Sequence, residues 1–190
     1  MKTKHEFDEV FDGQKVYRKL LEALSNPGRK VSLKDEASKF DNTSVRLAMA
    51  MTLLDNEVTF YTDGNEALRN EVELLTNAKH AALSSADFIF VKNEYELEEA
   101  FNSAKTGTLE DPQKSATLII SCEGLNNEKT YLKGPGIKDV QEFDLPSIVK
   151  KAVKRYTSLN IEYPMGMDMF FITDNYEVIG IPRLIRTEDR

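Results

Sequence analysis

The chain has 190 residues, of which 41% are hydrophobic and 30% are charged, a composition typical of a globular domain with one sizeable core. Its 25 basic and 32 acidic residues give a formal charge of -7. Nucleic acid is therefore a poor candidate partner, because binding to a phosphate backbone needs clustered positive charge. We expect a single domain over residues 1–190, with residues 1–10 as a mobile N-terminus.

The only cysteine, Cys122, lies in an apolar run, which excludes an intramolecular disulfide and suits a reducing compartment. The first ten residues contain no apolar signal segment. Apolar residues nowhere continue for the roughly 20 positions that a membrane span needs. These features predict a cytoplasmic protein without a membrane partner.

The first half of the chain alternates between helical and strand patterns. A helix is expected to begin at Asp12, as its cap, and to end at Asn26-Pro27-Gly28, because apolar residues recur between them at helical spacing. The periodicity and the β-branched content then predict a strand at 30–33, a helix opened by Asn42-Thr43, a strand at 57–62, a helix at 66–76, a strand at 87–91 and a helix at 94–101.

The second half adds hairpins to this alternation. Residues 115–122 form a run too apolar for a strand with one wet face, which places it in the centre of a sheet. The turn at 124–127 leads into 129–133 and predicts an antiparallel hairpin. A long helix follows Pro146, and residues 168–173 and 177–181 predict a second hairpin, which Pro182 ends. The predicted fold is α/β, a single-domain, three-layer mixed sheet flanked by helices.

No complete catalytic or metal-binding constellation is visible. The chain lacks a phosphate-binding glycine loop, and Gly134-Pro135-Gly136 reads as a tight turn better than as a dinucleotide fingerprint, since Asp139 stands in the place of the third glycine. His5 and His80, the only histidines, have no neighbours at ligand spacing. We therefore predict no catalytic residue, no metal site and no cofactor in this chain.

Several polar features allow two interpretations. Lys105-Thr106-Gly107-Thr108 reads either as an anion-binding turn or as the end of the preceding helix. Arg18, one turn after Gln14, is either solvated or an anchor for a phosphate or a subunit interface. Asp168, at the entrance of an apolar strand, either caps backbone amides or binds a ligand.

A dispersed set of motifs nevertheless resembles one family. In order they are Asp12-Gly-Gln14, Arg18-Lys-Leu-Leu, Asn26-Pro27-Gly28, Thr106-Gly-Thr108, Gly134-Pro-Gly-Ile137, Tyr163-Pro-Met-Gly166-Met-Asp168 and Ile181-Pro182-Arg183. Together they resemble the PhnH subunit family of bacterial carbon-phosphorus lyase, from about residue 11 to residue 186. The chain departs from the family pattern at 123–129 and at 165–171, which puts the details of partner contacts in doubt.

The resemblance implies a fold like the large domain of pyridoxal-phosphate (PLP) transferases, without PLP. It also implies a homodimer that joins the other lyase subunits PhnG, PhnI, PhnJ and PhnL. In such an assembly an alkylphosphonate displaces adenine from MgATP, its substrate, to give a ribose 1-alkylphosphonate 5-triphosphate. The isolated chain is then expected to be inactive, as one subunit of a ribose 1-methylphosphonate 5-triphosphate synthase, a transferase.

Two alternatives stay open at this point. The chain could be a free-standing transferase that binds PLP or a nucleotide, or a purely structural scaffold subunit. No catalytic role is carried over by a matched motif, so Arg18, Asp168 and Arg183 are candidates only for an interface or a ligand cluster.

Overall fold

The computed structural model describes residues 4–122 and 124–188. Its helices are α1 (Phe11–Ser25), α2 (Lys34–Ala37), α3 (Val45–Leu53), α4 (Glu66–Thr76), α5 (Glu94–Ser103) and α6 (Ser147–Ser158), with a 3-10 turn at Pro112–Lys114. The strands are β1 (Lys30–Ser32), β2 (Thr59–Thr62), β3 (Lys79–His80), β4 (Phe88–Val91), β5 (Thr117–Ser121), β6 (Asn127–Lys133), β7 (Gln141–Pro146), β8 (Asp168–Ile172), β9 (Glu177–Ile181) and β10 (Arg186–Thr187).

The strands of the described residues form two sheets. The larger has the order β1-β9-β8-β5-β4-β2-β3, in which β3, β2, β4, β5 and β8 are parallel neighbours and β9 and β1 continue antiparallel. The smaller has the order β10-β6-β7 and is antiparallel. The prediction of a mixed sheet is thus confirmed.

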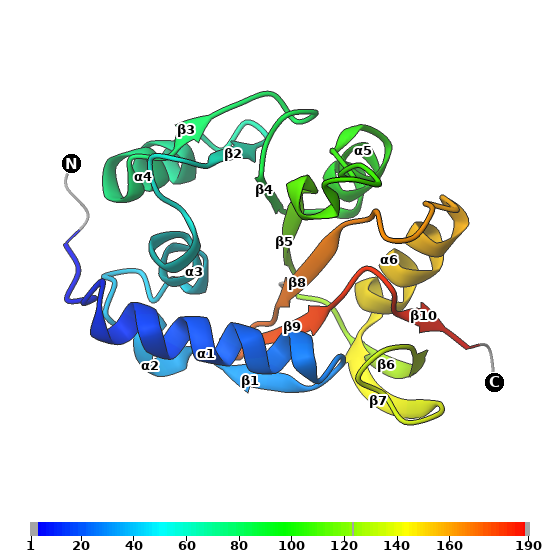
Figure 1. Cartoon of the computed structure of the whole chain (residues 1–190). Helices are drawn as coiled ribbons and strands as arrows, with labels where there is room; N and C mark the ends of the chain where they lie inside the picture. Colours follow the sequence, from blue (N-terminus) through cyan, green and yellow to red (C-terminus); the bar gives the residue numbers. More distant parts are fainter. Residues whose placement is uncertain (1–3, 123, 189–190) are drawn as a thin grey trace.

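Helices cover both faces of the large sheet. Figure 1 shows α1, α3 and α4 on one side and α5 and α6 on the other. Each side has its own core: Phe60, Phe90 and Phe170 face the first, and Ile89, Leu118 and Phe171 face the second. Neighbouring residues such as Phe170 and Phe171 belong to different cores because successive side chains on a strand point to opposite faces. This arrangement confirms helices flanking a mixed sheet.

One predicted hairpin is wrong. The strand at 129–133 was expected to pair with the run at 115–122, yet β5 lies between β4 and β8, and β6 pairs with β7 and β10. All but the first residue of β5 are buried, whereas β6 alternates between buried and more exposed positions. Because β5 pairs with the parallel strands β4 and β8 on its two sides, it has no free edge with which the segment that follows it could form a hairpin. The second hairpin, β8–β9, is confirmed.

The start of α1 also differs from its prediction. The helix begins at Phe11, and the side chain that caps its start is that of Asp8. Asp8 Oδ1 accepts the N–H groups of Val10 and Phe11 at 2.9 and 2.7 Å. Asp12 instead lies buried in the first turn. Its carboxylate accepts the N–H of Asp8 and the ammonium group of Lys39, and so ties α1 to the segment that follows α2.

The buried Asp12 should make stability depend on pH in the acid range. Burial raises its pKa, but the hydrogen bonds from Lys39 and from the Asp8 amide outweigh this, so the pKa lies below its ordinary value of 3.8. As the pH falls, Asp12 therefore becomes protonated in the unfolded chain before it does so in the folded chain. The stability that ionised Asp12 contributes above pH 3.8 is lost as the pH drops through its pKa in the folded chain.

We expect Asp12→Asn to be less stable than the parent chain at neutral pH and to lose less stability between about pH 5 and pH 2. Urea unfolding across this range measures both effects. Parallel stability curves for the variant and the parent would show that Asp12 does not carry the acid dependence.

Candidate functional site

Asp168 and Arg183 form an ion pair at the start of β8 and the end of β9. Arg183 Nη2 and Nε donate to the two carboxylate oxygens of Asp168 at 2.6 and 3.2 Å, and the Arg183 amide adds a bond of 2.9 Å. The side chain of Arg183 is 19% exposed and that of Asp168 is 25% exposed. The antiparallel pairing of β8 with β9 places the two residues together, because Met169 lies opposite Ile181.

The remaining donors of Arg183 also have acceptors in the chain. Nη1 donates to the carbonyl oxygens of Pro112 and Pro164 at 2.9 and 3.5 Å, and Nη2 donates to Ser115 Oγ at 3.0 Å. The Asp168 hydrogen bond raises the pKa of Arg183 above its ordinary value. All five N–H donors of the guanidinium are thus occupied. The geometry favours a cross-link between loops over a ligand cluster.

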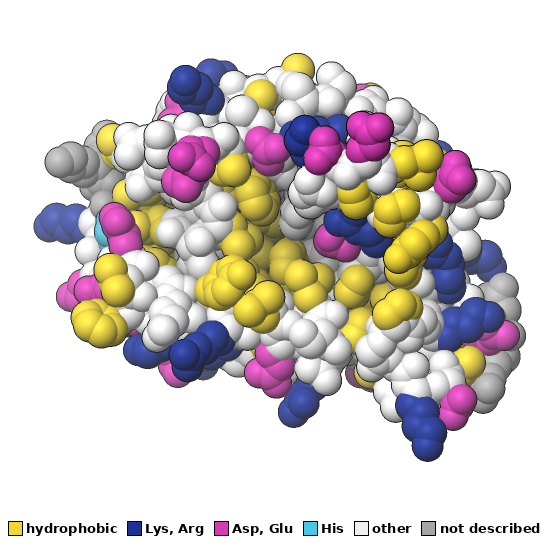
Figure 2. Space-filling model, viewed as in Figure 1, with side chains coloured by type: hydrophobic (Ala, Val, Ile, Leu, Met, Phe, Trp, Pro, Cys, Tyr) yellow, Lys and Arg dark blue, Asp and Glu magenta, His cyan; other side chains and the backbone are white. Residues whose placement is uncertain are grey.

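Arg18 lies apart from this pair, on the outer side of α1. It is exposed, as are Tyr17 and Leu21 beside it, and Val10 and Phe11 at the start of the helix are more exposed still. Figure 2 shows hydrophobic side chains gathered across the middle of the face that carries α1. The structure therefore joins two of the three predicted residues and leaves Arg18 on a partly apolar surface.

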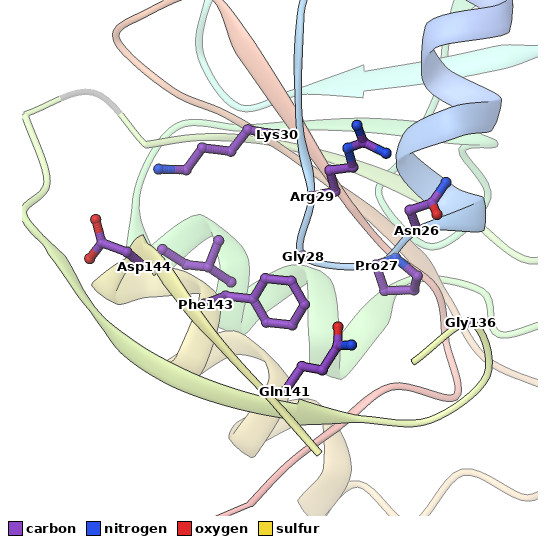
Figure 3. Close-up of a pocket in the computed structure, with 10 residues that line it drawn as sticks. Asn26, Pro27, Gly28, Arg29, Lys30, Gly136, Gln141, Phe143 and Asp144 are labelled. Atoms are coloured by element: carbon purple, nitrogen blue, oxygen red, sulfur yellow. The ribbon is translucent and has the colours of Figure 1, made fainter. Parts of the chain in front are cut away.

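A groove of about 420 Å³ opens where the end of α1 meets the small sheet. One wall comes from Asn26 to Lys30 and the other from Gln141 to Leu145 of β7, with Gly136 at one end. Figure 3 shows the ring of Phe143 directed at the Pro27–Gly28 turn and Lys30 extended to the side on which Asp144 lies. The volume falls within the range of small-ligand pockets.

Gly136 allows the two walls of this groove to meet. Its φ of +84° is rarely adopted by L side chains, and a Cβ there would lie 2.9 Å from both the Ser25 carbonyl oxygen and Pro27 Cδ. Ile137 donates its N–H to the Gly134 carbonyl at 3.0 Å, which confirms the tight turn expected at this motif. The glycine is explained by close packing against the end of α1.

The groove combines cations with polar and aromatic groups that the sequence did not single out. Arg29 and Lys30 supply positive charge, Gln141 an amide, and Phe143 a half-buried ring. Arg29 Nη1 lies 3.7 Å from Glu22 Oε1, and Asp144 adds a negative charge to the lining, so the groove carries charges of both signs beside the ring. The sequence feature that could have indicated this groove is the position of Arg29 and Lys30 directly after the Pro27-Gly28 turn.

Other polar features of the sequence have structural partners. Lys105 forms an ion pair with Asp87. On the basic side of α6, Lys151 and Arg155 bind the glutamates of α5 at 2.6 and 2.5 Å. Among residues 4–122 and 124–188, no three His, Cys, Asp or Glu side chains are grouped to hold a metal ion, and no helix is long and apolar enough to cross a membrane.

Cys122 is buried at the end of β5. Burial, with a smaller effect from Asp174, raises the pKa of its thiol to about 12. A thiol is nucleophilic only as the thiolate, so this side chain is a packing residue at neutral pH.

Apart from the two motifs on α1, at Asp12–Gln14 and at Arg18–Leu21, the motifs that are scattered along the sequence gather at two places. The Asn26-Pro27-Gly28 turn and Gly136 line the groove. Pro112, Pro164, Asp168 and Arg183 meet at the ion pair, where Gly166 also donates its N–H to the Thr106 carbonyl at 2.8 Å. Residues from distant parts of the chain thus form two connected structures rather than independent turns.

Comparison with known proteins identifies the family that shares these motifs. The family described as bacterial phosphonate metabolism protein (PhnH) matches residues 5–188. A Stutzerimonas stutzeri protein named "Putative C-P lyase subunit protein HtxG" is 28% identical over 171 residues, which cover 90% of this chain and 83% of the relative. The alpha-D-ribose 1-methylphosphonate 5-triphosphate synthase subunit PhnH of Rhizobium meliloti (strain 1021) is 25% identical over 192 residues, which cover 95% and 92%.

The family match includes both clusters, the groove and the Asp168–Arg183 pair, and it runs through every helix and strand of the described residues. The chain belongs to the PhnH family of bacterial phosphonate metabolism proteins.

Proposed function

We propose that this chain is a subunit of a carbon-phosphorus lyase assembly and supports the displacement of adenine from MgATP by an alkylphosphonate. The product is a ribose 1-alkylphosphonate 5-triphosphate. The observation that carries the proposal is the family match over residues 5–188, together with the relative from Rhizobium meliloti that is named as a subunit of the corresponding synthase. The likeness to the large domain of PLP transferases, without PLP, remains part of this proposal.

The chain contributes mainly by binding other subunits. The exposed apolar residues beside Arg18 on α1 support a contact surface there, since large apolar groups grouped on one face mark sites of association. The Asp168–Arg183 pair keeps the loops around it in place. In this proposal the chain forms a homodimer, joins PhnG, PhnI, PhnJ and PhnL in the cytoplasm, and is inactive alone.

The decisive experiment measures adenine release from MgATP and methylphosphonate by the partner subunits, with and without this chain. We expect release to need the chain, because the displacement is proposed as a property of the assembly. Unchanged release without it would contradict the proposal and leave a purely structural role. Release by the isolated chain, or a Schiff-base absorbance after addition of PLP, would favour a free-standing transferase.

A further inference from the structure

The small sheet ends in a strand whose outer edge is free. Its order is β10-β6-β7, so β7 pairs with β6 and has no strand on its other side among the described residues. β7 is six residues long, and Glu142 and Asp144 within it are exposed. A free strand edge carries N–H and C=O groups to which an added strand can bond.

The register of the small sheet shows which groups face outward. Next to β10, Glu188 donates its N–H to the Tyr131 carbonyl at 2.9 Å, so the backbone of Tyr131 in β6 faces β10 and not β7. Tyr131 lies opposite Glu142. Because bonded and non-bonded pairs alternate along an antiparallel ladder, the N–H and C=O groups of Glu142 and of Asp144, two residues later, point away from β6. In residues 4–122 and 124–188, no backbone hydrogen bond outside the ladder reaches these groups.

The groove of Figure 3 borders this free edge. Gln141 to Leu145 of β7 form one of its walls, and Asn26 to Lys30 form the other. Phe143, whose ring is half-buried, points into the groove toward the Pro27–Gly28 turn. Side chains on a strand alternate between two faces, so every second side chain of a strand added beside β7 would enter the groove. Its volume of about 420 Å³ gives such apolar side chains room.

The opposite face of β7 is acidic, and this charge distinguishes between possible partners. Glu142 forms an ion pair with Lys129 at 2.8 Å, and Asp144 accepts a hydrogen bond from the amide group of Asn127 at 3.1 Å. If β7 paired with a second copy of itself, Glu142 would lie opposite Asp144 of that copy. Like charges in opposite positions destabilise a strand pair, and unlike charges stabilise it. The edge therefore favours a different chain, with basic residues at these positions.

We propose that the free edge of β7 binds an extended segment of a partner subunit, which becomes the fourth strand of the small sheet. In this segment apolar side chains alternate with Lys or Arg. The apolar ones enter the groove beside Phe143, and the basic ones lie opposite Glu142 and Asp144. Backbone hydrogen bonds supply the affinity, and the alternating side chains supply the specificity. The inference rests on the proposed function, because it needs an assembly that supplies the segment.

The rival interpretation is that the acidic residues of β7 only keep other strands away, since charged side chains commonly protect an edge strand in this way. The two interpretations differ in what a change at the edge does. If protection is the only role, an altered edge leaves association with the partner subunits as it is. If a segment docks there, the altered edge weakens that association.

The first experiment measures binding of the full-length chain to the purified partner subunits. We expect Asp144→Pro to weaken it by at least about 10-fold, because proline removes the outward N–H and its ring obstructs the edge. Asp144→Lys should weaken it by about 3- to 10-fold, because lysine repels the basic residues of the segment. Asp144→Lys leaves the backbone intact, and so it tests the edge even if the proline variant unfolds.

Thr187→Pro is the matched control, on the opposite edge of the same sheet. Thr187 belongs to β10 and lies opposite Leu132. Since its neighbour Glu188 bonds to β6, the N–H of Thr187 points outward, as that of Asp144 does. We expect Thr187→Pro to change binding by less than about 2-fold, because proline is tolerated where the N–H of an edge strand faces solvent.

Hydrogen exchange followed by NMR then locates the contact. In the free chain the amides of Glu142 and Asp144 should exchange faster than those of Phe143 and Leu145, which bond to β6. Binding of the partner subunit should slow the first two by at least about 10-fold, because they become bonded to the added strand.

Three results would overturn the inference. They are partner binding that leaves the Glu142 and Asp144 amides exchanging as in the free chain, partner binding unchanged in both Asp144 variants, and protection of these amides by self-association of the chain alone. Adenine release by the assembly tests the subunit role separately. If the partner subunits bind elsewhere on the chain, only the β7 edge is refuted, whereas the absence of any binding would contradict the subunit role as well.

Discussion

Gly180→Ala should destabilise the chain by about 3 kcal/mol, because an added methyl group has no space between α1 and β9. A Cβ at Gly180 would lie 2.6 Å from the carbonyl carbon of Ala23 and 2.7 Å from its oxygen. Both atoms belong to the backbone of α1, so a side-chain rotation cannot relieve the clash. The helix would have to move away from the sheet, and the contacts of Val16 and Leu20 in the first core would loosen.

Gly13→Ala is the matched control for this substitution. Gly13 lies in α1, the helix that packs against Gly180, and a Cβ at Gly13 would meet no atom within 4 Å. Alanine is favoured over glycine in a helix interior, so this variant should be more stable than the parent by about 0.5–1 kcal/mol. Urea unfolding at neutral pH compares the two. Equal effects at both positions would show that α1 does not rest on β9 as closely as described.

Arg183→Ala should lower the free energy of unfolding by about 3 kcal/mol. The variant loses the ion pair with Asp168 and the bonds to the Pro112 carbonyl and to Ser115. It also leaves the mostly buried Asp168 carboxylate without its cation. Asp168→Asn should cost less, since the amide oxygen still accepts one of these hydrogen bonds.

Arg18→Ala should affect association with partner subunits rather than stability, the reverse of what is expected for Arg183→Ala. Because Arg18 is exposed, its removal should change stability by no more than about 0.5 kcal/mol, yet weaken association with the partner subunits. Urea unfolding and size-exclusion chromatography of the mixed subunits separate the two effects. Equal losses of stability and assembly in Arg18→Ala would defeat the interface role, and an unaltered stability in Arg183→Ala would defeat the structural role of that pair.

Local signals made much of the fold predictable. The helix at 66–76 matches α4, since Asn65 accepts the N–H of Leu68 at its start and Asn77 adopts a left-handed conformation at its end. The pairing of β6 was not predictable in this way. The turn at 124–127 indicates where the chain reverses, but which strand β6 meets depends on β7, whose sequence, Gln-Glu-Phe-Asp-Leu-Pro, has little strand signal.

The same contrast applies to the candidate sites. Asp168 and Arg183 flank the correctly predicted β8–β9 hairpin, so their proximity follows from the sequence pattern. The groove needs the β6–β7 pairing and was therefore missed, although both of its glycine turns had been noted.

The burial of the single cysteine gives the protein a practical property. With a pKa of about 12, the Cys122 thiol should react slowly with maleimides at neutral pH. A cysteine introduced at another exposed position of α1, as in Gln14→Cys, would then be the one rapidly labelled position. A fluorophore or spin label attached there would report the docking of each partner subunit in solution, one binding event at a time, without removal of any native residue from the core.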